Sequence, residues 1–301
     1  MKYISAKLTG IRLLLLGLFL NIPFVWKFFN IKGVQKYHRY HEAKSGKEEE
    51  ILSELLTEGI VAFNISDISN TTLTDLQKWM ESKKNATITG THKDSFLKYY
   101  LGGKYLTEEQ FFEVSNPLID FSLSDKLLGV VNSYFSMFAR LIYLECNETI
   151  VLEKSDNLTL SQKFHRDPGI RGCLKVFVYL TDVGEGDGAF TYIRNTHTYG
   201  KFCNFFKQRF FGVGGVYPDD ADIRKIFEPK DIYEVLGDAG TVIIADTTGI
   251  HKGGLSVNRA REMTTSVFYP PADYHKSKIK IGPGFDQLKK SHSQFFALTG
   301  K

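Results

Sequence analysis

The stretch "KVFVYLTDVGEGDGAFTYIR" (175–194) decides the fold class of this chain. Two short runs rich in β-branched and aromatic residues stand on either side of a glycine-rich turn, "GEGDG", which is the pattern of two strands joined by a loop. Successive side chains of a strand point to opposite faces. One face of the first run therefore carries core residues, namely Leu174, Val176, Val178 and Leu180. The other carries Lys175, Phe177 and Tyr179, so that Lys175 either lines a cavity or extends along apolar surface to solvent.

Similar short runs occupy most of the chain after residue 140. They are "LIYLECNETIVLE" (141–153), "DIYEVLG" (231–237), "TVIIAD" (241–246) and "TTSVFY" (264–269). Many short strands separated by Gly, Asp and Asn turns are typical of an antiparallel sandwich or barrel and not of βαβ units. We therefore predict a mainly β protein with flanking helices, whose core is a double-stranded β-helix, the jelly roll of cupin-like proteins.

The half of the chain before residue 140 is predicted to be helical and to pack on this core. Three pairs have the spacing of a capping box and predict helix starts: Thr72 with Asp75, Thr107 with Gln110, and Ser122 with Asp125. The last pair leads into "KLLGVVNSYFSMFA" (126–139), whose apolar residues share one helical face and should pack on a sheet.

Composition limits the function classes. The 301 residues are 43% hydrophobic and carry a net charge of +4, as expected for one large globular domain with appendages. No Lys/Arg run is dense enough to predict nucleic-acid binding. Three cysteines without Cys-x-x-Cys spacing argue against a disulfide framework and against a zinc site, and they fit a reducing, cytoplasmic location.

The N-terminus contains an uncharged run from Leu13 to Trp26, which follows Lys2, Lys7 and Arg12. A membrane-spanning helix needs about 20 apolar residues, and this run is shorter. Three interpretations stay open: a helix packed on the domain, an interfacial anchor that rests on the inner face of a membrane, and a short signal anchor. We assign residues 1–50 to this N-terminal helical or apolar segment and a linker, and residues 51–301 to the main domain.

"SQKFHRDPG" (161–169) contains the first candidate site residues, His165 and Asp167. A kinase catalytic loop also reads His-Arg-Asp, but it needs an Asn where this chain has Gly172, and the other kinase motifs are missing. On a strand, His165 and Asp167 point to the same side. A second histidine would complete the two-histidine, one-carboxylate set that suits Fe(II).

"DTTGIHKGGLSVNRAREMTTSVFY" (246–269) supplies that histidine, His251, after an apolar strand. Arg261 follows ten residues later at the start of a new strand. A fixed guanidinium there suits bidentate binding of a carboxylate. The three candidate metal ligands are thus His165, Asp167 and His251.

These motifs resemble the phytanoyl-CoA dioxygenase family of Fe(II)- and 2-oxoglutarate-dependent oxygenases, over roughly residues 58–270. The resemblance implies that His165, Asp167 and His251 bind iron and are catalytic, and that Arg261 binds the distal carboxylate of 2-oxoglutarate, with Arg259 as the competing choice. It also implies O2 as cosubstrate, ascorbate as a possible reductant, and conversion of 2-oxoglutarate to succinate and carbon dioxide. Some related halogenases replace the carboxylate with a small residue, so the presence of Asp167 favours hydroxylation.

Further positions are assigned by the same resemblance. Gln162 is a candidate contact to the cosubstrate, with a solvent-facing strand residue as the alternative, and Lys175 is a second candidate for cosubstrate binding. Asn195 and His197 stand where the family usually has Gly-Ser-His, and we interpret His197 as structural. Asp246 is expected to form a turn near His251 or to hydrogen-bond to a ligand.

An insertion at about 199–231 interrupts the strand pattern. Phe202, Phe205, Phe206 and Phe210 recur at helical spacing, with Lys201, Lys207 and Arg209 between them. They predict either a helix packed on the barrel or a lid, hinged at "GVGG" (212–215), that meets an amphiphilic substrate.

The resulting hypothesis is a hydroxylase of a small-molecule or membrane-associated metabolite. One alternative is the same oxidative chemistry with another outcome, such as desaturation, cyclisation or epimerisation. Another is a non-catalytic jelly roll that binds a ligand. Nothing in the pattern specifies the substrate or the oligomeric state.

Overall fold

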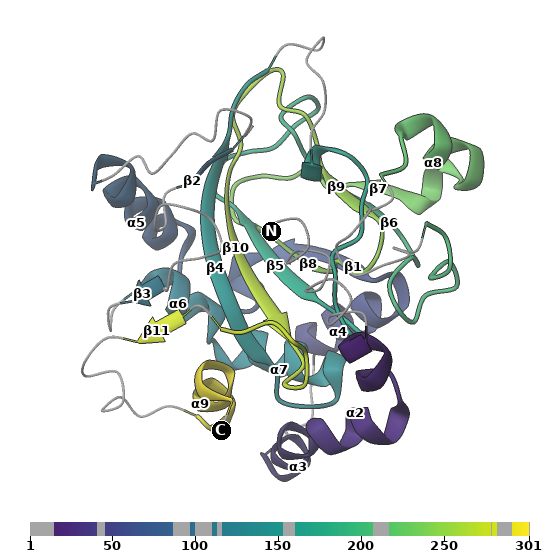
Figure 1. The fold of residues 1–301 in the computed structure, drawn as a ribbon. Helices are drawn as coiled ribbons and strands as arrows, with labels where there is room; N and C mark the ends of the chain where they lie inside the picture. Colours follow the sequence, from purple (N-terminus) through teal and green to yellow (C-terminus); the bar gives the residue numbers. More distant parts are fainter. Residues whose placement is uncertain are drawn as a thin grey trace, which may run out of the picture.

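The structure is a computed structural model that describes residues 15–40, 46–86, 97–99, 110–112, 116–152, 160–206, 217–277, 279–281 and 291–300. Helices surround antiparallel sheets, and a large sheet runs through the middle of the molecule beside a smaller one (Figure 1).

The large sheet has six strands in the order β1-β8-β5-β10-β4-β2, and all neighbours are antiparallel. These strands are β1 (Ile60–Asn64), β8 (Thr241–Asp246), β5 (Leu174–Tyr179), β10 (Glu262–Tyr269), β4 (Arg140–Thr149) and β2 (Leu97–Tyr99). The small sheet has the order β7 (Ile232–Glu234), β6 (Phe190–Ile193) and β9 (His251–Gly253). A separate parallel pair joins β3 (Gln110–Phe112) to β11 (Ile279–Ile281).

The chain passes repeatedly between the two main sheets. After β4 in the large sheet, His165 pairs with β9 of the small sheet, and β5 then returns to the large sheet. Strands β6 and β7 belong to the small sheet, β8 to the large, β9 to the small and β10 to the large. This alternation is the winding expected of a jelly roll, and the strands predicted after residue 140 are all present.

The helices are α2 (Pro23–Phe29), α3 (Ile31–Tyr40), α4 (Lys47–Glu58), α5 (Leu73–Ala86), α6 (Pro117–Ser122), α7 (Asp125–Phe135), α8 (Asp220–Ile226) and α9 (His292–Thr299), with short 3-10 turns η1 (Ile65–Asp67), η2 (Leu160–Gln162) and η3 (Pro229–Asp231). Helices α4 and α7 pack on the large sheet, whereas α8 packs beside the small sheet. Leu174, Val176 and Val178 join a core cluster with residues of α4 and α7. Phe177 and Tyr179 join a second cluster with β6 on the other side of the sheet. The alternation predicted for β5 is therefore confirmed, and both faces of this strand are buried.

Two of the three predicted helix starts are wrong. Thr72 and Asp75 exchange capping hydrogen bonds of 3.0 and 3.2 Å at the start of α5, as predicted. Ser122, in contrast, ends α6 and donates its hydroxyl hydrogen to the Leu118 carbonyl, because Asn116 caps an earlier helix that α7 then follows. Gln110 lies in strand β3, and Thr107 lies outside the described residues.

The N-terminal helices pack on the domain through one side only. Leu20, Val25 and Trp26 form a cluster with Ile170. Asn30 ties the end of α2 to the body of the protein, because its side-chain oxygen accepts a hydrogen bond of 2.9 Å from the Ala272 amide. Within the part of the chain that the structure describes, every helix is too short or too polar to span a bilayer.

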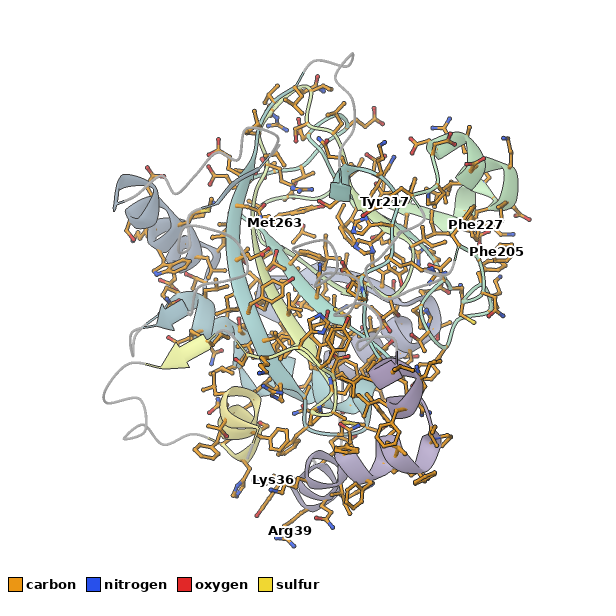
Figure 2. All side chains as sticks on the ribbon, in the orientation of Figure 1. Lys36, Arg39, Phe205, Tyr217, Phe227 and Met263 are labelled. Carbon is orange, nitrogen blue, oxygen red and sulfur yellow. The ribbon has the colours of Figure 1, made fainter. Side chains whose placement is uncertain are left out.

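The insertion differs from the predicted helix. Residues 201–206 form turns, because the Phe202 amide hydrogen-bonds back to the Asn195 carbonyl at 2.8 Å and Phe206 has a left-handed φ of 47°. Phe202 and Phe206 still pack on the domain, against a cluster that includes Phe227. Figure 2 shows Phe205 and Phe227 beside each other, with ring centroids 5.6 Å apart. Phe210, Lys207, Arg209 and residues 212–215 lie outside the described residues.

Candidate metal centre

A pair of backbone hydrogen bonds brings the two candidate histidines together. The His165 amide donates to the His251 carbonyl and the His251 amide donates to the His165 carbonyl, each at 2.9 Å. Residues paired in this way on antiparallel strands project to the same face. Their ring centroids are accordingly 4.3 Å apart, although the two residues are far apart in sequence.

Asp167 completes a group with these imidazoles. Its amide donates to the Thr247 carbonyl at 2.8 Å, which continues the alignment of the two segments. Oδ1 of Asp167 lies 3.8 Å from Nε2 of His165, and Oδ2 lies 3.4 Å from Nε2 of His251. One ligand atom from each of the three residues lies within 4.8 Å of the others, so the group could hold a metal ion.

Both imidazole rings are oriented by the chain itself. Nδ1 of His165 donates to the Lys163 carbonyl at 2.9 Å, and Nδ1 of His251 donates to the Gly249 carbonyl at 3.0 Å. A proton held on Nδ1 leaves the lone pair on Nε2, the nitrogen that faces Asp167. Burial, together with the neighbouring His251, lowers the pKa of His165 to about 4. His165 is therefore neutral at physiological pH, the form that binds metals.

Lys175 forms an ion pair with the carboxylate of this group. Its ammonium lies 2.7 Å from Oδ2 of Asp167, and both side chains are less than one fifth exposed, at 17% and 16%. Burial alone would raise the pKa of Asp167, but Lys175 and the two histidines outweigh it and hold that pKa well below its usual value. Lys175 therefore lines the interior and does not extend along apolar surface to solvent.

Arg261 and Arg259 lie in different environments. Arg261 is 2% exposed, its Nη1 donates to the Gly188 carbonyl, and its guanidinium lies 6.0 Å from the centre of the Tyr179 ring. Its Nε has no hydrogen-bond partner, and burial lowers the pKa of the guanidinium. The side chain of Arg259 is 62% exposed and pairs with Asp187 at 2.7 Å. Only Arg261 of these two is a buried cation without a carboxylate partner in the described residues.

Gln162 is 2% exposed and ends the turn η2. The alternative of a solvent-facing strand residue is therefore wrong. Gln162 lies three residues before His165 in the sequence. The turn η2 contacts strand β9, which carries His251.

The turn before His251 is fixed by Asp246, as its position in the sequence suggests. This fully buried carboxylate accepts hydrogen bonds from the Tyr134 hydroxyl at 2.6 Å and from the Cys173 amide at 3.2 Å. It also accepts from the amide and hydroxyl of Thr248 at 3.0 and 2.7 Å. The sequence did not identify Tyr134 as a partner of Asp246, because Tyr134 lies 112 residues away on α7.

His197 is buried beside Gly59 and lies outside the candidate metal group.

Arg166, between the two candidate ligands His165 and Asp167, holds two loops together, which the His-Arg-Asp motif does not predict. Its guanidinium donates to the carbonyls of Thr196, Thr248 and Phe205 at 2.5, 2.5 and 2.8 Å. It therefore fastens the start of the insertion to the turn that leads into His251.

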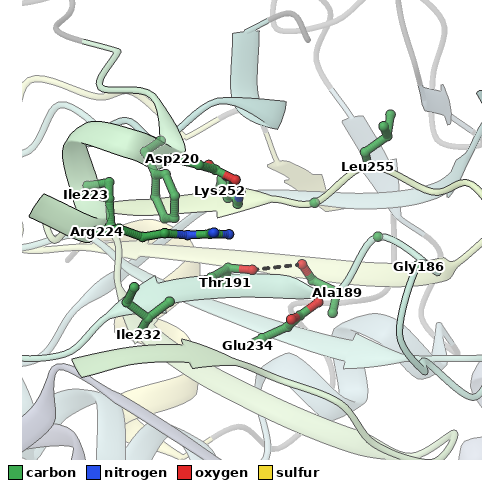
Figure 3. A pocket seen from close by; sticks show the side chains of 13 residues that line it. Gly186, Ala189, Thr191, Asp220, Ile223, Arg224, Ile232, Glu234, Lys252 and Leu255 are labelled. Carbon is green, nitrogen blue, oxygen red and sulfur yellow. Dashed lines mark hydrogen bonds and ion pairs between the residues drawn. The ribbon is translucent and has the colours of Figure 1, made fainter. Parts of the chain in front are cut away.

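A separate pocket lies on the opposite face of the small sheet. Its volume is about 230 Å³, and its lining includes Phe164, Thr191, Arg224 and Lys252 (Figure 3). Phe164 directly precedes His165, and Lys252 directly follows His251. Because side chains alternate along a strand, both point away from the metal group. Lys252 pairs there with Asp220 at 2.7 Å. This pocket is therefore not the candidate centre.

The fold is similar to that of two proteins that were solved with iron bound. EctD from S. alaskensis, solved with bound Fe, superposes with a TM-score of 0.55 at 15% identity, over 82% of this chain and 86% of that one. The epimerase SnoN, solved with Fe3+, alpha ketoglutarate and nogalamycin RO, superposes with a TM-score of 0.51 at 13% identity, over 81% of this chain and 94% of that one.

At the level of sequence, no protein-family model and no curated protein matches the chain. What the structural comparisons show is the fold alone, which this chain shares with EctD and SnoN. Membership of the phytanoyl-CoA dioxygenase family is not shown by them.

Proposed function

We propose that this chain is an Fe(II)- and 2-oxoglutarate-dependent dioxygenase with a double-stranded β-helix core, related to the phytanoyl-CoA dioxygenases. It hydroxylates an unactivated carbon of a small-molecule or amphiphilic metabolite. The observation that carries the proposal is the orientation of His165 and His251. Each donates Nδ1–H to a carbonyl of its own segment and directs Nε2 toward Asp167.

The donor set fits iron. Two imidazoles and one carboxylate form the donor set that suits Fe(II) and leaves positions open for other ligands. When bound, the iron together with 2-oxoglutarate and O2 supplies the oxidising chemistry. The contribution of the chain is to hold these ligands in place and to bury them between two sheets.

Arg261 is the residue we assign to the distal carboxylate of 2-oxoglutarate. A guanidinium that is 2% exposed is costly unless an anion pairs with it. In the described residues its hydrogen-bond partners, the Gly188 carbonyl and the Tyr179 hydroxyl, are neutral, and Nε is left over for a ligand. Arg261 also lies near the strand of His251, since a Cβ added at Gly253 would be 3.9 Å from Nη2 of Arg261.

Lys175 and Gln162 are assigned supporting roles. The ammonium of Lys175 keeps Asp167 ionised and fixes its orientation. Gln162 is buried just before His165 and offers an amide to the cosubstrate or substrate.

Turnover of 2-oxoglutarate tests the proposal. Purified protein with Fe(II), 2-oxoglutarate and O2 should release succinate, while His165→Ala and His251→Ala should release none and retain their circular dichroism spectra. His38→Ala is the control, because His38 is exposed on α3. Full succinate production by His251→Ala would refute the assignment, and identification of the oxidised product would distinguish hydroxylation from desaturation or epimerisation.

A further inference from the structure

The outer side of the N-terminal helices exposes an unusual number of large apolar side chains. Nine of them between residues 15 and 31 are at least 39% exposed, and Phe24 and Phe28 reach 73% and 68%. We call this set the N-terminal apolar face. It consists of Leu15, Leu16, Leu18, Phe19, Ile22, Phe24, Phe28, Phe29 and Ile31.

Three rings of the apolar face contact one another, and the helices beneath them are packed on the domain. The rings of Phe19 and Phe29 are 6.3 Å apart and those of Phe28 and Phe29 are 5.5 Å apart, so that side chains of successive helices touch. The opposite side of the same helices is buried through Leu20, Val25 and Trp26. One side of these helices therefore packs on the domain, and the other side is exposed to solvent. Exposed apolar patches of this kind mark interaction sites.

The sequence around the apolar face carries basic residues and no acidic ones. Residues 1–41 contain seven Lys or Arg and no Asp or Glu: Lys2, Lys7, Arg12, Lys27, Lys32, Lys36 and Arg39. Because the whole chain has a net charge of only +4, the rest of it is net negative. Figure 2 shows Lys36 and Arg39 together at the edge of the molecule formed by α3, which directly follows α2.

We propose that the N-terminal apolar face binds the surface of a membrane that contains anionic lipids. Exposed Phe and Leu side chains insert at the boundary between headgroups and acyl chains, and the surrounding Lys and Arg side chains meet the anionic headgroups. Charge argues against a second copy of the chain as the occupant. A symmetric dimer through this face would place the same cations of the two copies close to each other.

The face is joined to the segment that carries Asp167. Ile170 packs in the same cluster as Trp26, and the guanidinium of Arg171 lies 5.6 Å from the centre of the Trp26 ring. Arg171 also donates to the Asn21 carbonyl at 2.9 Å. The helices that carry the apolar face would therefore lie between a bound bilayer and the loop that follows the candidate metal centre.

Sedimentation with vesicles tests the proposal on the full-length protein at low salt. The protein should sediment with vesicles that contain phosphatidylglycerol and much less with pure phosphatidylcholine. The double variant Phe24→Ser/Phe28→Ser and the double variant Lys27→Gln/Lys32→Gln should each weaken binding by about tenfold or more. All four side chains are exposed, so thermal stability should be unchanged.

Ile226→Ser is the matched control, because Ile226 is 43% exposed on α8, at another side of the molecule (Figure 1), and its loss should leave vesicle binding unchanged. A protein that stays in the supernatant with anionic vesicles would overturn the proposal, as would unchanged binding by both double variants. A lipid-free dimer that Phe24→Ser/Phe28→Ser dissociates would also overturn it and would assign the face to self-association. Succinate formation without vesicles is independent of this result, so failure here does not count against the proposed function.

Discussion

The ammonium of Lys175 lies 2.7 Å from Oδ2 of Asp167, in the interior between the two main sheets. Lys175 therefore contacts the same carboxylate that a bound metal ion would contact. In the metal-free protein, Lys175 compensates the carboxylate, and a metal ion would supply additional positive charge to the same group.

Replacement of Lys175 should therefore destabilise the metal-free protein more than the metal-bound protein. For Lys175→Met we expect a loss of about 1–3 kcal/mol in the free energy of unfolding without metal, since the pair is partly screened by solvent. Fe(II) or Ni(II) should restore more stability to the variant than to the wild type. Thermal melting with and without metal measures both effects.

Lys252 provides the matched control for this experiment. Its side chain is 16% exposed, against 17% for Lys175, and it pairs with Asp220 at the same distance of 2.7 Å. Because Lys252 lies on the opposite face of the small sheet, Lys252→Met should show no dependence on metal. Equal losses for Lys175→Met with and without metal would contradict the role assigned to Lys175.

Arg261→Leu should raise the 2-oxoglutarate concentration needed for half-maximal succinate formation. The loss of a buried ion pair corresponds to roughly 2–5 kcal/mol of binding free energy. Arg259→Leu should leave this concentration unchanged, because its side chain is 62% exposed and pairs with Asp187 at the surface. The reverse ranking would transfer the role to Arg259.

Gly59→Ala should destabilise the fold strongly. Gly59 ends α4 with φ of 80°, and an added Cβ would lie 2.4 Å from Nδ1 of His197 and 2.6 Å from the Tyr192 hydroxyl oxygen. We expect a loss of about 3 kcal/mol from backbone strain and overpacking together. Gly300→Ala is the control, because Gly300 ends α9 with a left-handed φ of 69° and an added Cβ would come no closer than 3.3 Å to another atom, and it should cost only about 1 kcal/mol. Chemical denaturation compares the two, and equal losses would show that the crowding around Gly59 is unimportant.

Local patterns predicted much of the sheet architecture and the three residues, His165, Asp167 and His251, that come together as a candidate metal group. Alternation along β5 correctly assigned Lys175 to the side of Phe177 and Tyr179, because a strand fixes side-chain direction from one residue to the next. The ion pair of Lys175 with Asp167 was not predictable, because the two residues lie on segments of different sheets and come together only in the folded protein.

The failures share a physical cause. Phe202, Phe205 and Phe206 have helical spacing, but the hydrogen bond from Phe202 back to Asn195 bends the chain into turns. Spacing reports which residues could share a face and is insensitive to such tertiary contacts. The hydrogen bonds from Nδ1 of His165 and His251 to carbonyls two residues earlier likewise depend on backbone conformation that sequence does not specify.

The most direct test of the central claim is an anaerobic titration of the purified protein with Fe(II) and then 2-oxoglutarate. The account predicts a weak visible charge-transfer band that forms only when both are present, because the cosubstrate must bind the metal held by His165, Asp167 and His251. His251→Ala should not form the band, whereas His38→Ala should form it as the wild type does. Absence of the band in the wild type, or an undiminished band in His251→Ala, would contradict the proposed centre.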